Sequence, residues 1–425
     1  MSDKPLNRPF SYVLMLFCLT VFQIFSFFPV LFTDNGEINL KISMCAVGFI
    51  AVEWLYLLFA RLITSRSDFA LEIIAFFLSG IGLVNCASIH ENYAVKQIVA
   101  IAIGLLCFAI ISAIMRSIDT AMFLRTPMAV GAILLLVLNL VLAKTTNGAL
   151  NWITIGSFSF QPSELVKVAF IFVGAATLEK LQATRSLTKY IIFSVGCIGA
   201  LFLMRDFGTA LIFFFTFIVI AFMRSGDIRS IFLICTVALL GAVLVISFKP
   251  YVANRFANYR HIWDFVNESG FQQTRVLIYG SSGGLLGLGI GNGKLRNVFA
   301  ASTDLVFGMI CEEWGILLAF LIIISFAIVA VYAVKGARKS SSVFYSIASV
   351  SAAALLLFQL ALNVFGITDL LPMTGVTLPF VSRGGSSVIS SWALFALIKS
   401  VNFNIGDIKP YHRKKNKSKH KGVVV

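Results

Sequence analysis

The sequence predicts an all-α, polytopic membrane protein. Hydrophobic residues make up 59% of the 425 positions and charged residues only 12%, and the mean hydropathy is +0.92. Soluble domains do not reach these values. The apolar runs are continuous rather than alternating, and a helix needs about 20 apolar residues to cross a bilayer. The chain therefore crosses the membrane as helices rather than as a β-barrel.

These runs predict about twelve membrane helices. The first is longer than the apolar core of a signal peptide and lacks a small-x-small cleavage site, so it counts as a span. The approximate bounds are 12–32, 43–60, 71–89, 95–115, 128–144, 163–179, 189–204, 207–223, 231–248, 304–334, 343–366 and 380–401. We divide the chain into a two-helix extension (1–66), a transmembrane domain (67–401) and a basic tail (402–425).

Lysine and arginine are concentrated in alternate links between the spans. The positive-inside rule therefore places both termini in the cytoplasm and the long polar segment 249–303 outside. The net charge of +15 is distributed among the links and the tail, which favours anionic lipid heads over nucleic acid as the partner. The basic links contain Arg61/Arg66, Arg116/Arg125, Lys180/Arg185/Lys189, Arg224/Arg229 and Lys335/Arg338/Lys339.

The outer loop 249–303 is itself basic, which the positive-inside rule does not explain. Its only carboxylates are Asp264 and Glu268. The excess of positive charge suits a ligand that carries phosphate. A solvated loop with scattered charge is the alternative. The cations are Lys249, Arg255, Arg260, Arg275, Lys294 and Arg296.

Charged residues inside or beside the spans are costly and call for a reason. Glu164 and Lys167 stand at i and i+3, on one face of a helix, and can pair. The alternative is an ordinary helix start, with Ser163 as the cap and an acidic first turn. Asp206 follows Arg205 in a predicted tight turn at the same depth, so it can share one outward-facing site with Glu164 and Lys167.

Other motifs carry less chemistry. Glu312 and Glu313 are adjacent on a helix and point about 100° apart, so they do not form an acid/base pair by themselves. The glycine-rich run 280–293 lacks the Ser or Thr of a Walker motif, because Leu295 follows Lys294, and it indicates close backbone packing instead. No zinc spacing or nucleophile elbow is present, which argues against zinc hydrolysis and proteolysis.

Five motifs in order, over about residues 70–401, resemble the SEDS family, to which RodA, FtsW and SpoVE belong. They are Gly148–Trp152 running to Gln161–Glu164 and Lys167; Asp206–Thr209; Gly270–Gln272; Thr303-Asp304 with Glu312–Gly315; and Thr374–Ser382 running to Gly384–Ser387. The chain departs from the family pattern at four positions in or near these motifs. Phe265 stands where Pro follows the aspartate, Phe271 replaces Tyr, Arg205 replaces Pro, and Arg383 replaces an aromatic residue.

The resemblance implies a SEDS-like ten-helix core preceded by two extra helices, and a peptidoglycan glycosyltransferase that polymerises lipid II on the outer face of the bacterial plasma membrane. Transfer from the undecaprenyl-diphosphate-linked disaccharide would invert the configuration at the anomeric carbon. The reaction would serve growth, division or sporulation. The implied partner is a class B penicillin-binding protein, a transpeptidase. A divalent cation, Mg²⁺ or Mn²⁺, stays open as a cofactor. Such a transfer needs one general base and neutralisation of the diphosphate.

The family's catalytic aspartate matches Asp264 best, with Glu268 as the competitor. Glu164 would orient Lys167, and Asp206 would shape the cavity or help hold a divalent ion. The expected diphosphate ligands are Lys96, Lys167, Arg260 and Arg275, and Gln272, Thr303 and Asp304 are further substrate-binding candidates.

Two other functions stay open at this point. A flippase or transporter of the lipid-linked precursor would also use charged residues in the spans, although a carrier needs them reachable from both faces. A non-catalytic scaffold for a transpeptidase would accommodate the departures around Asp264.

Overall fold

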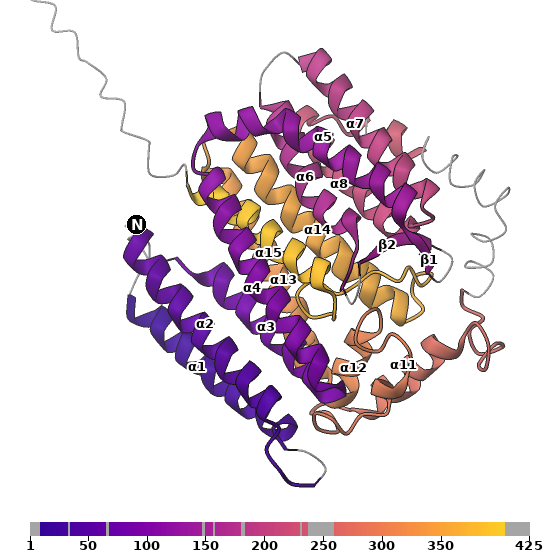
Figure 1. The fold of residues 1–425 in the computed structure, drawn as a ribbon. Helices are drawn as coiled ribbons and strands as arrows, with labels where there is room; N and C mark the ends of the chain where they lie inside the picture. Colours follow the sequence, from indigo (N-terminus) through magenta and orange to yellow (C-terminus); the bar gives the residue numbers. More distant parts are fainter. Residues whose placement is uncertain are drawn as a thin grey trace, which may run out of the picture.

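A computed structural model describes residues 9–32, 35–64, 68–146, 149–155, 158–179, 183–229, 232–236 and 259–403. The fold is a bundle of helices with a short irregular segment at one end (Figure 1). The first seven helices are α1 (Pro9–Phe27), α2 (Leu40–Thr64), α3 (Ala70–Ile89), α4 (Glu91–Ile114), α5 (Ile118–Leu142), α6 (Pro162–Leu178) and α7 (Ala183–Leu203). The others are α8 (Phe207–Ser225), α11 (Phe271–Ser282), α12 (Val306–Glu313), α13 (Ile316–Lys339), α14 (Val343–Ile367) and α15 (Gly385–Lys399).

Eight of the described helices are long and apolar enough to cross a membrane, namely α1 to α5, α8, α13 and α14. The chain is therefore a multi-pass membrane protein, as predicted. Twelve spans are not established, because most of the predicted span 231–248 lies outside the described residues. The tail from 404 onward also lies outside them. The prediction of one helix over 304–334 is wrong: α12 ends at Glu313 and α13 begins at Ile316, because Gly315 takes a φ of 84°.

The centre of the bundle is formed by the short helices α6 and α15, whose side chains are almost all buried. Close packing around them depends on glycine. A Cβ on Gly104 of α4 would come within 2.8 Å of the Trp392 ring of α15, and a Cβ on Gly82 of α3 within 2.8 Å of the Phe380 carbonyl. Backbones that approach this closely are typical of membrane helix interfaces. These contacts bring the segment before α15 against α3 and α4.

The two N-terminal helices lie outside α3 and α4 (Figure 1). Gln23 of α1 donates from Nε2 to Glu53 Oε2 of α2 at 2.7 Å, and both side chains are buried. Glu72 of α3 pairs with Lys399 at the end of α15. The partners of Glu53 and Glu72 lie 30 and 327 positions away in the sequence. Both carboxylates tie helices together inside the bundle.

A small antiparallel sheet lies in the link between α5 and α6, a local departure from the all-helical fold. Its strands are β1 (Lys144–Thr146), β2 (Ala149–Ile155) and β3 (Phe158–Phe160), in the order β1-β2-β3. The amide of Leu150 donates to the Met204 carbonyl at 2.9 Å, which fixes β2 against the end of α7. Asn151 and Trp152 of β2 therefore lie near the residues at which α6 and α8 begin.

Candidate functional site

A buried ion pair lies at the start of α6. Lys167 Nζ is 2.7 Å from Glu164 Oε1 and also donates to Gln359 Oε1 of α14 at 3.0 Å. Ser390 of α15 donates to the second Glu164 oxygen at 2.8 Å. The predicted pairing is confirmed, and the polar partners on α14 and α15 offset the cost of burying both charges. Ser163 as the cap is wrong: α6 begins at Pro162, and Gln161 occupies the N-cap.

Asp206 is held at the neighbouring helix start. Arg205 takes a φ of 60°, which turns the chain sharply after α7. Asp206 Oδ1 then caps α8 by accepting from the Thr209 amide at 3.2 Å, while its Oδ2 accepts from Gln161 Nε2 at 2.8 Å. The predicted tight turn is therefore present, and Gln161 connects it to the Glu164 end of α6.

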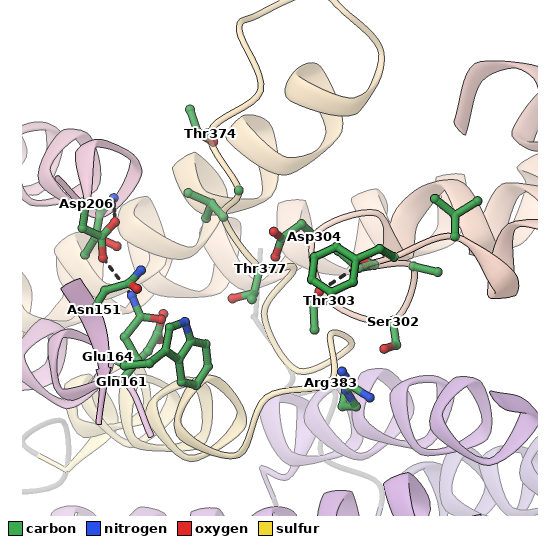
Figure 2. A pocket seen from close by; sticks show the side chains of 18 of the residues that line it. Asn151, Gln161, Glu164, Asp206, Ser302, Thr303, Asp304, Thr374, Thr377 and Arg383 are labelled. Carbon is green, nitrogen blue, oxygen red and sulfur yellow. Dashed lines mark hydrogen bonds between the residues drawn. The ribbon is translucent and has the colours of Figure 1, made fainter. Parts of the chain in front are cut away.

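These helix starts form one wall of a cavity of about 490 Å³. Its other walls come from the end of α3, the start of α4, strand β2, and the segments 296–304 and 374–383. Three arginines, Arg205, Arg296 and Arg383, also line it. Figure 2 shows the other polar side chains gathered around the same space, which are Asn151, Gln161, Glu164, Asp206, Ser302, Thr303, Asp304, Thr374 and Thr377.

The charge of the cavity is close to balanced but unevenly distributed. Its lining carries three arginines and three carboxylates, those of Glu164, Asp206 and Asp304. Lys167, directly beneath, already neutralises Glu164. Cations, carboxylates and side-chain amides around one concave space are suited to a ligand that carries both phosphate and hydroxyl groups.

Four predicted site residues line this cavity: Glu164, Asp206, Thr303 and Asp304. Lys167 joins them from below through Glu164. Among the missed residues are Asn151, Gln161, Thr374 and Thr377, polar positions inside the quoted motifs. Their presence in an otherwise apolar chain is the signal that could have found them.

The other predicted residues do not line the cavity. Asp264 is exposed, with 70% of its side chain accessible, and its Oδ2 lies 3.3 Å from His261 Nδ1. Gln272 comes nearest, because it donates to the carbonyl of the cavity residue Phe299 at 3.3 Å. The remaining three are Arg260, which faces the Tyr259 ring; Arg275, which lies over Phe271; and Lys96, which is exposed on α4.

The glycine-rich run wraps around Glu312 and Glu313. Glu312 accepts from the amides of Lys294 and Leu295 at 2.7 and 2.9 Å, and Glu313 accepts from the Gly291 amide at 3.1 Å. A Cβ on Gly293 would come within 2.7 Å of Glu312 Oε2. Close backbone packing is thus confirmed, and it fixes the segment that leads to Arg296 and the cavity.

Glu312→Gln is expected to lower the free energy of unfolding by about 1–3 kcal/mol, because a glutamine amide group would face a buried backbone N–H. Glu313→Gln, which loses one longer hydrogen bond, should cost less. Thermal unfolding of the detergent-purified variants checks this order. Equal losses would show that the two backbone hydrogen bonds of Glu312 are not the stabilising feature.

A pH effect is expected from the same pair. Burial raises the pKa of Glu313 from 4.5 to about 7. The folded state therefore holds this proton more tightly than the unfolded chain, and the stabilisation is lost as the pH rises through about 7. Between about pH 5 and pH 7 the wild type should lose more thermal stability than Glu313→Gln. Identical pH profiles for the two proteins would contradict this assignment.

A metal site is not evident among the described residues, where no three His, Cys, Asp or Glu side chains are grouped to hold an ion. Asp206 in particular is engaged by Gln161 and the Thr209 amide. We derive no step through Mg²⁺ or Mn²⁺.

The fold and the cavity together define a multi-pass membrane protein with a polar, ligand-sized site at one end of its bundle. The family model described as Cell cycle protein, for FtsW, RodA and SpoVE, matches residues 69–405. The chain belongs to this family, the SEDS proteins of the bacterial cell wall. Helices α1 and α2 precede the matched region.

Named relatives agree with this membership. A probable peptidoglycan glycosyltransferase FtsW from Buchnera aphidicola is 33% identical over 298 residues, 65% of this chain and 75% of the relative. Stage V sporulation protein E from Bacillus subtilis is 30% identical over 263 residues, 60% of this chain and 72% of the relative. A chain of a solved peptidoglycan synthase complex superposes with a TM-score of 0.66 at 25% identity, over 79% of this chain and 98% of that chain.

Proposed function

We propose that this protein is a peptidoglycan glycosyltransferase that polymerises lipid II on the outer face of the plasma membrane, with both termini in the cytoplasm. The observation that carries the proposal is the cavity at one end of the bundle, where arginines, carboxylates and amides meet. Lipid II combines a diphosphate, sugars rich in hydroxyl groups and a long apolar tail. The polar lining of the cavity suits the diphosphate and the sugars, and the surrounding membrane suits the tail.

The comparisons support the same reaction class. The relative from Buchnera aphidicola is named a probable peptidoglycan glycosyltransferase, and the similar structure was solved in a complex for polymerisation and crosslinking. We propose that this chain likewise works with a crosslinking enzyme, a class B penicillin-binding protein. Its helices then supply the membrane part of a two-enzyme assembly.

Chemically, the proposed transfer joins an acceptor hydroxyl to the sugar carbon that bears the diphosphate, with inversion. A base removes the hydroxyl proton, the new carbon–oxygen bond forms, and the lipid diphosphate leaves with its electron pair. Arginines beside the diphosphate stabilise the negative charge that grows on it. Because the leaving group is already activated, one base is enough.

We propose Asp264 as the base that removes the proton from the acceptor hydroxyl. Its carboxylate is exposed on the segment that follows Arg260 and lies outside the cavity. Catalytic contacts are often long in ligand-free structures and tighten only with substrate bound. The role therefore requires the segment from Tyr259 to Gly270 to approach the cavity when lipid II is bound. Asp304, which lines the cavity, is the carboxylate to compare with it.

The deciding experiment is glycan synthesis from lipid II by the purified protein with its transpeptidase, followed by gel separation of the chains. Polymer is expected from the wild type. Lipid II movement across vesicle membranes without polymer would instead favour a flippase. Cell-wall synthesis that survives loss of the base, at equal membrane abundance, would favour a scaffold.

A further inference from the structure

We propose that Arg383 binds the diphosphate of the lipid-linked substrate and so fixes which way the substrate lies in the cavity. This inference rests on the proposed function and deepens it. The loop arginines that the sequence suggested for this task, Arg260 and Arg275, do not line the cavity, whereas Arg383 does.

Arg383 is held in place before any ligand arrives. Its amide donates to the Ser302 carbonyl at 2.7 Å. The preceding Ser382 donates to the Thr303 carbonyl at 2.6 Å, and the Ser382 carbonyl accepts from Gln97 of α4 at 3.3 Å. The backbone at Arg383 is therefore tied to both α4 and the segment that carries Asp304.

The side chain is positioned by stacking. The guanidinium carbon lies 3.9 Å from the centroid of the Tyr93 ring. Stacking uses the flat face of the guanidinium and leaves its N–H groups at the edge, where they match two phosphate oxygens at once. Within the part of the chain that the structure describes, no ion pair involves Arg383. Its charge is thus available for an anionic ligand.

The opposite side of the cavity carries two carboxylates, of which Glu164 is paired with Lys167 and Asp206 follows Arg205 in the chain. There the carboxylates of Glu164 and Asp206 stand beside Gln161 and Asn151, while Arg383 lies apart from them, near Ser302 (Figure 2). Carboxylates repel a diphosphate but accept hydrogen bonds from sugar hydroxyls. We therefore place the diphosphate beside Arg383 and Tyr93, and the sugars toward Asn151 and Gln161.

The test compares Arg383→Gln and Arg383→Lys with the wild type in lipid II polymerisation. Loss of charge-assisted hydrogen bonds should raise KM for lipid II about 10- to 100-fold in Arg383→Gln. Inhibition of the Arg383→Gln protein by added undecaprenyl diphosphate should weaken in parallel. Inhibition by undecaprenyl phosphate should weaken less. Arg383→Lys keeps the charge but loses the planar guanidinium, so its KM should lie between that of the wild type and that of Arg383→Gln.

Arg116→Gln is the matched control, because Arg116 is exposed in the link between α4 and α5. This substitution should leave KM for lipid II unchanged. An Arg383→Gln protein with the KM and inhibition of the wild type would overturn the inference. The inference would also be overturned if Arg383→Gln and Arg383→Lys showed the same rise in KM together with lowered thermal stability. That result would mean that Arg383 acts through packing. If Arg383→Gln does not fold, unchanged diphosphate inhibition of Arg383→Lys overturns it. A wild type that makes no polymer would instead refute the proposed function.

Discussion

Asp264→Asn is expected to reduce the rate of glycan polymerisation by about 100- to 10 000-fold, the usual contribution of a general base. Asparagine has the shape of aspartate but cannot accept the hydroxyl proton. The Asp264 side chain is exposed, and among the described residues its hydrogen bond or ion pair is with His261, so the substitution should leave folding intact. The measurement is kcat of the purified complex, with KM for lipid II expected to change little.

Two further variants decide between carboxylates, namely Glu268→Gln on the same exposed segment and Asp304→Asn in the cavity. Both should retain most of the activity if Asp264 is the base. Full activity of Asp264→Asn would remove it from the mechanism. A loss confined to one of the other variants would transfer the role to that carboxylate.

Lys167→Met should be the most destabilising single change in the site. It would leave the Glu164 carboxylate buried without its cation, and breaking a buried ion pair in this way costs about 3–5 kcal/mol. Lys167 is 1% exposed and Glu164 is 4% exposed, so water cannot compensate. The expected results are a lower thermal unfolding midpoint in detergent, a lower yield and loss of polymerisation.

The double variant Glu164→Gln with Lys167→Met should be more stable than Lys167→Met alone, because no unpaired charge is then buried. The exposed pair Lys41–Glu91, 2.5 Å apart, provides the matched control. Lys41→Met should change stability little, since water screens both of its charges. If Lys41→Met and Lys167→Met lose the same stability, burial of the Glu164–Lys167 pair is not what matters.

Features that depend on neighbouring residues could be predicted from the sequence. The membrane class followed from long apolar runs, and the Glu164–Lys167 pair followed from the i,i+3 spacing on one helix. The turn before α8 followed from Arg205-Asp206 interrupting an apolar stretch. The span predicted over 304–334 failed for an equally local reason, because Gly315 breaks the helix between α12 and α13.

The candidate site could be predicted only in part. Its motifs named Glu164, Asp206, Thr303 and Asp304, which do meet in one cavity. The sequence favoured the basic loop around Arg260 as the diphosphate site, whereas the arginine that lines the cavity near Ser302 is Arg383. Nothing in the local sequence relates Arg383 to Tyr93, which is 290 positions earlier.

The sequence by itself determined that this chain is a helical membrane protein of the SEDS family and which motifs hold its polar residues. The tertiary structure decided which of those residues share a space. Gly82 and Gly104 let α3 and α4 approach the segment around α15, and this packing brings Arg383 onto Tyr93 and into the cavity. Contacts of this kind depend on how side chains fill the space between distant helices, and a one-dimensional pattern does not contain that information.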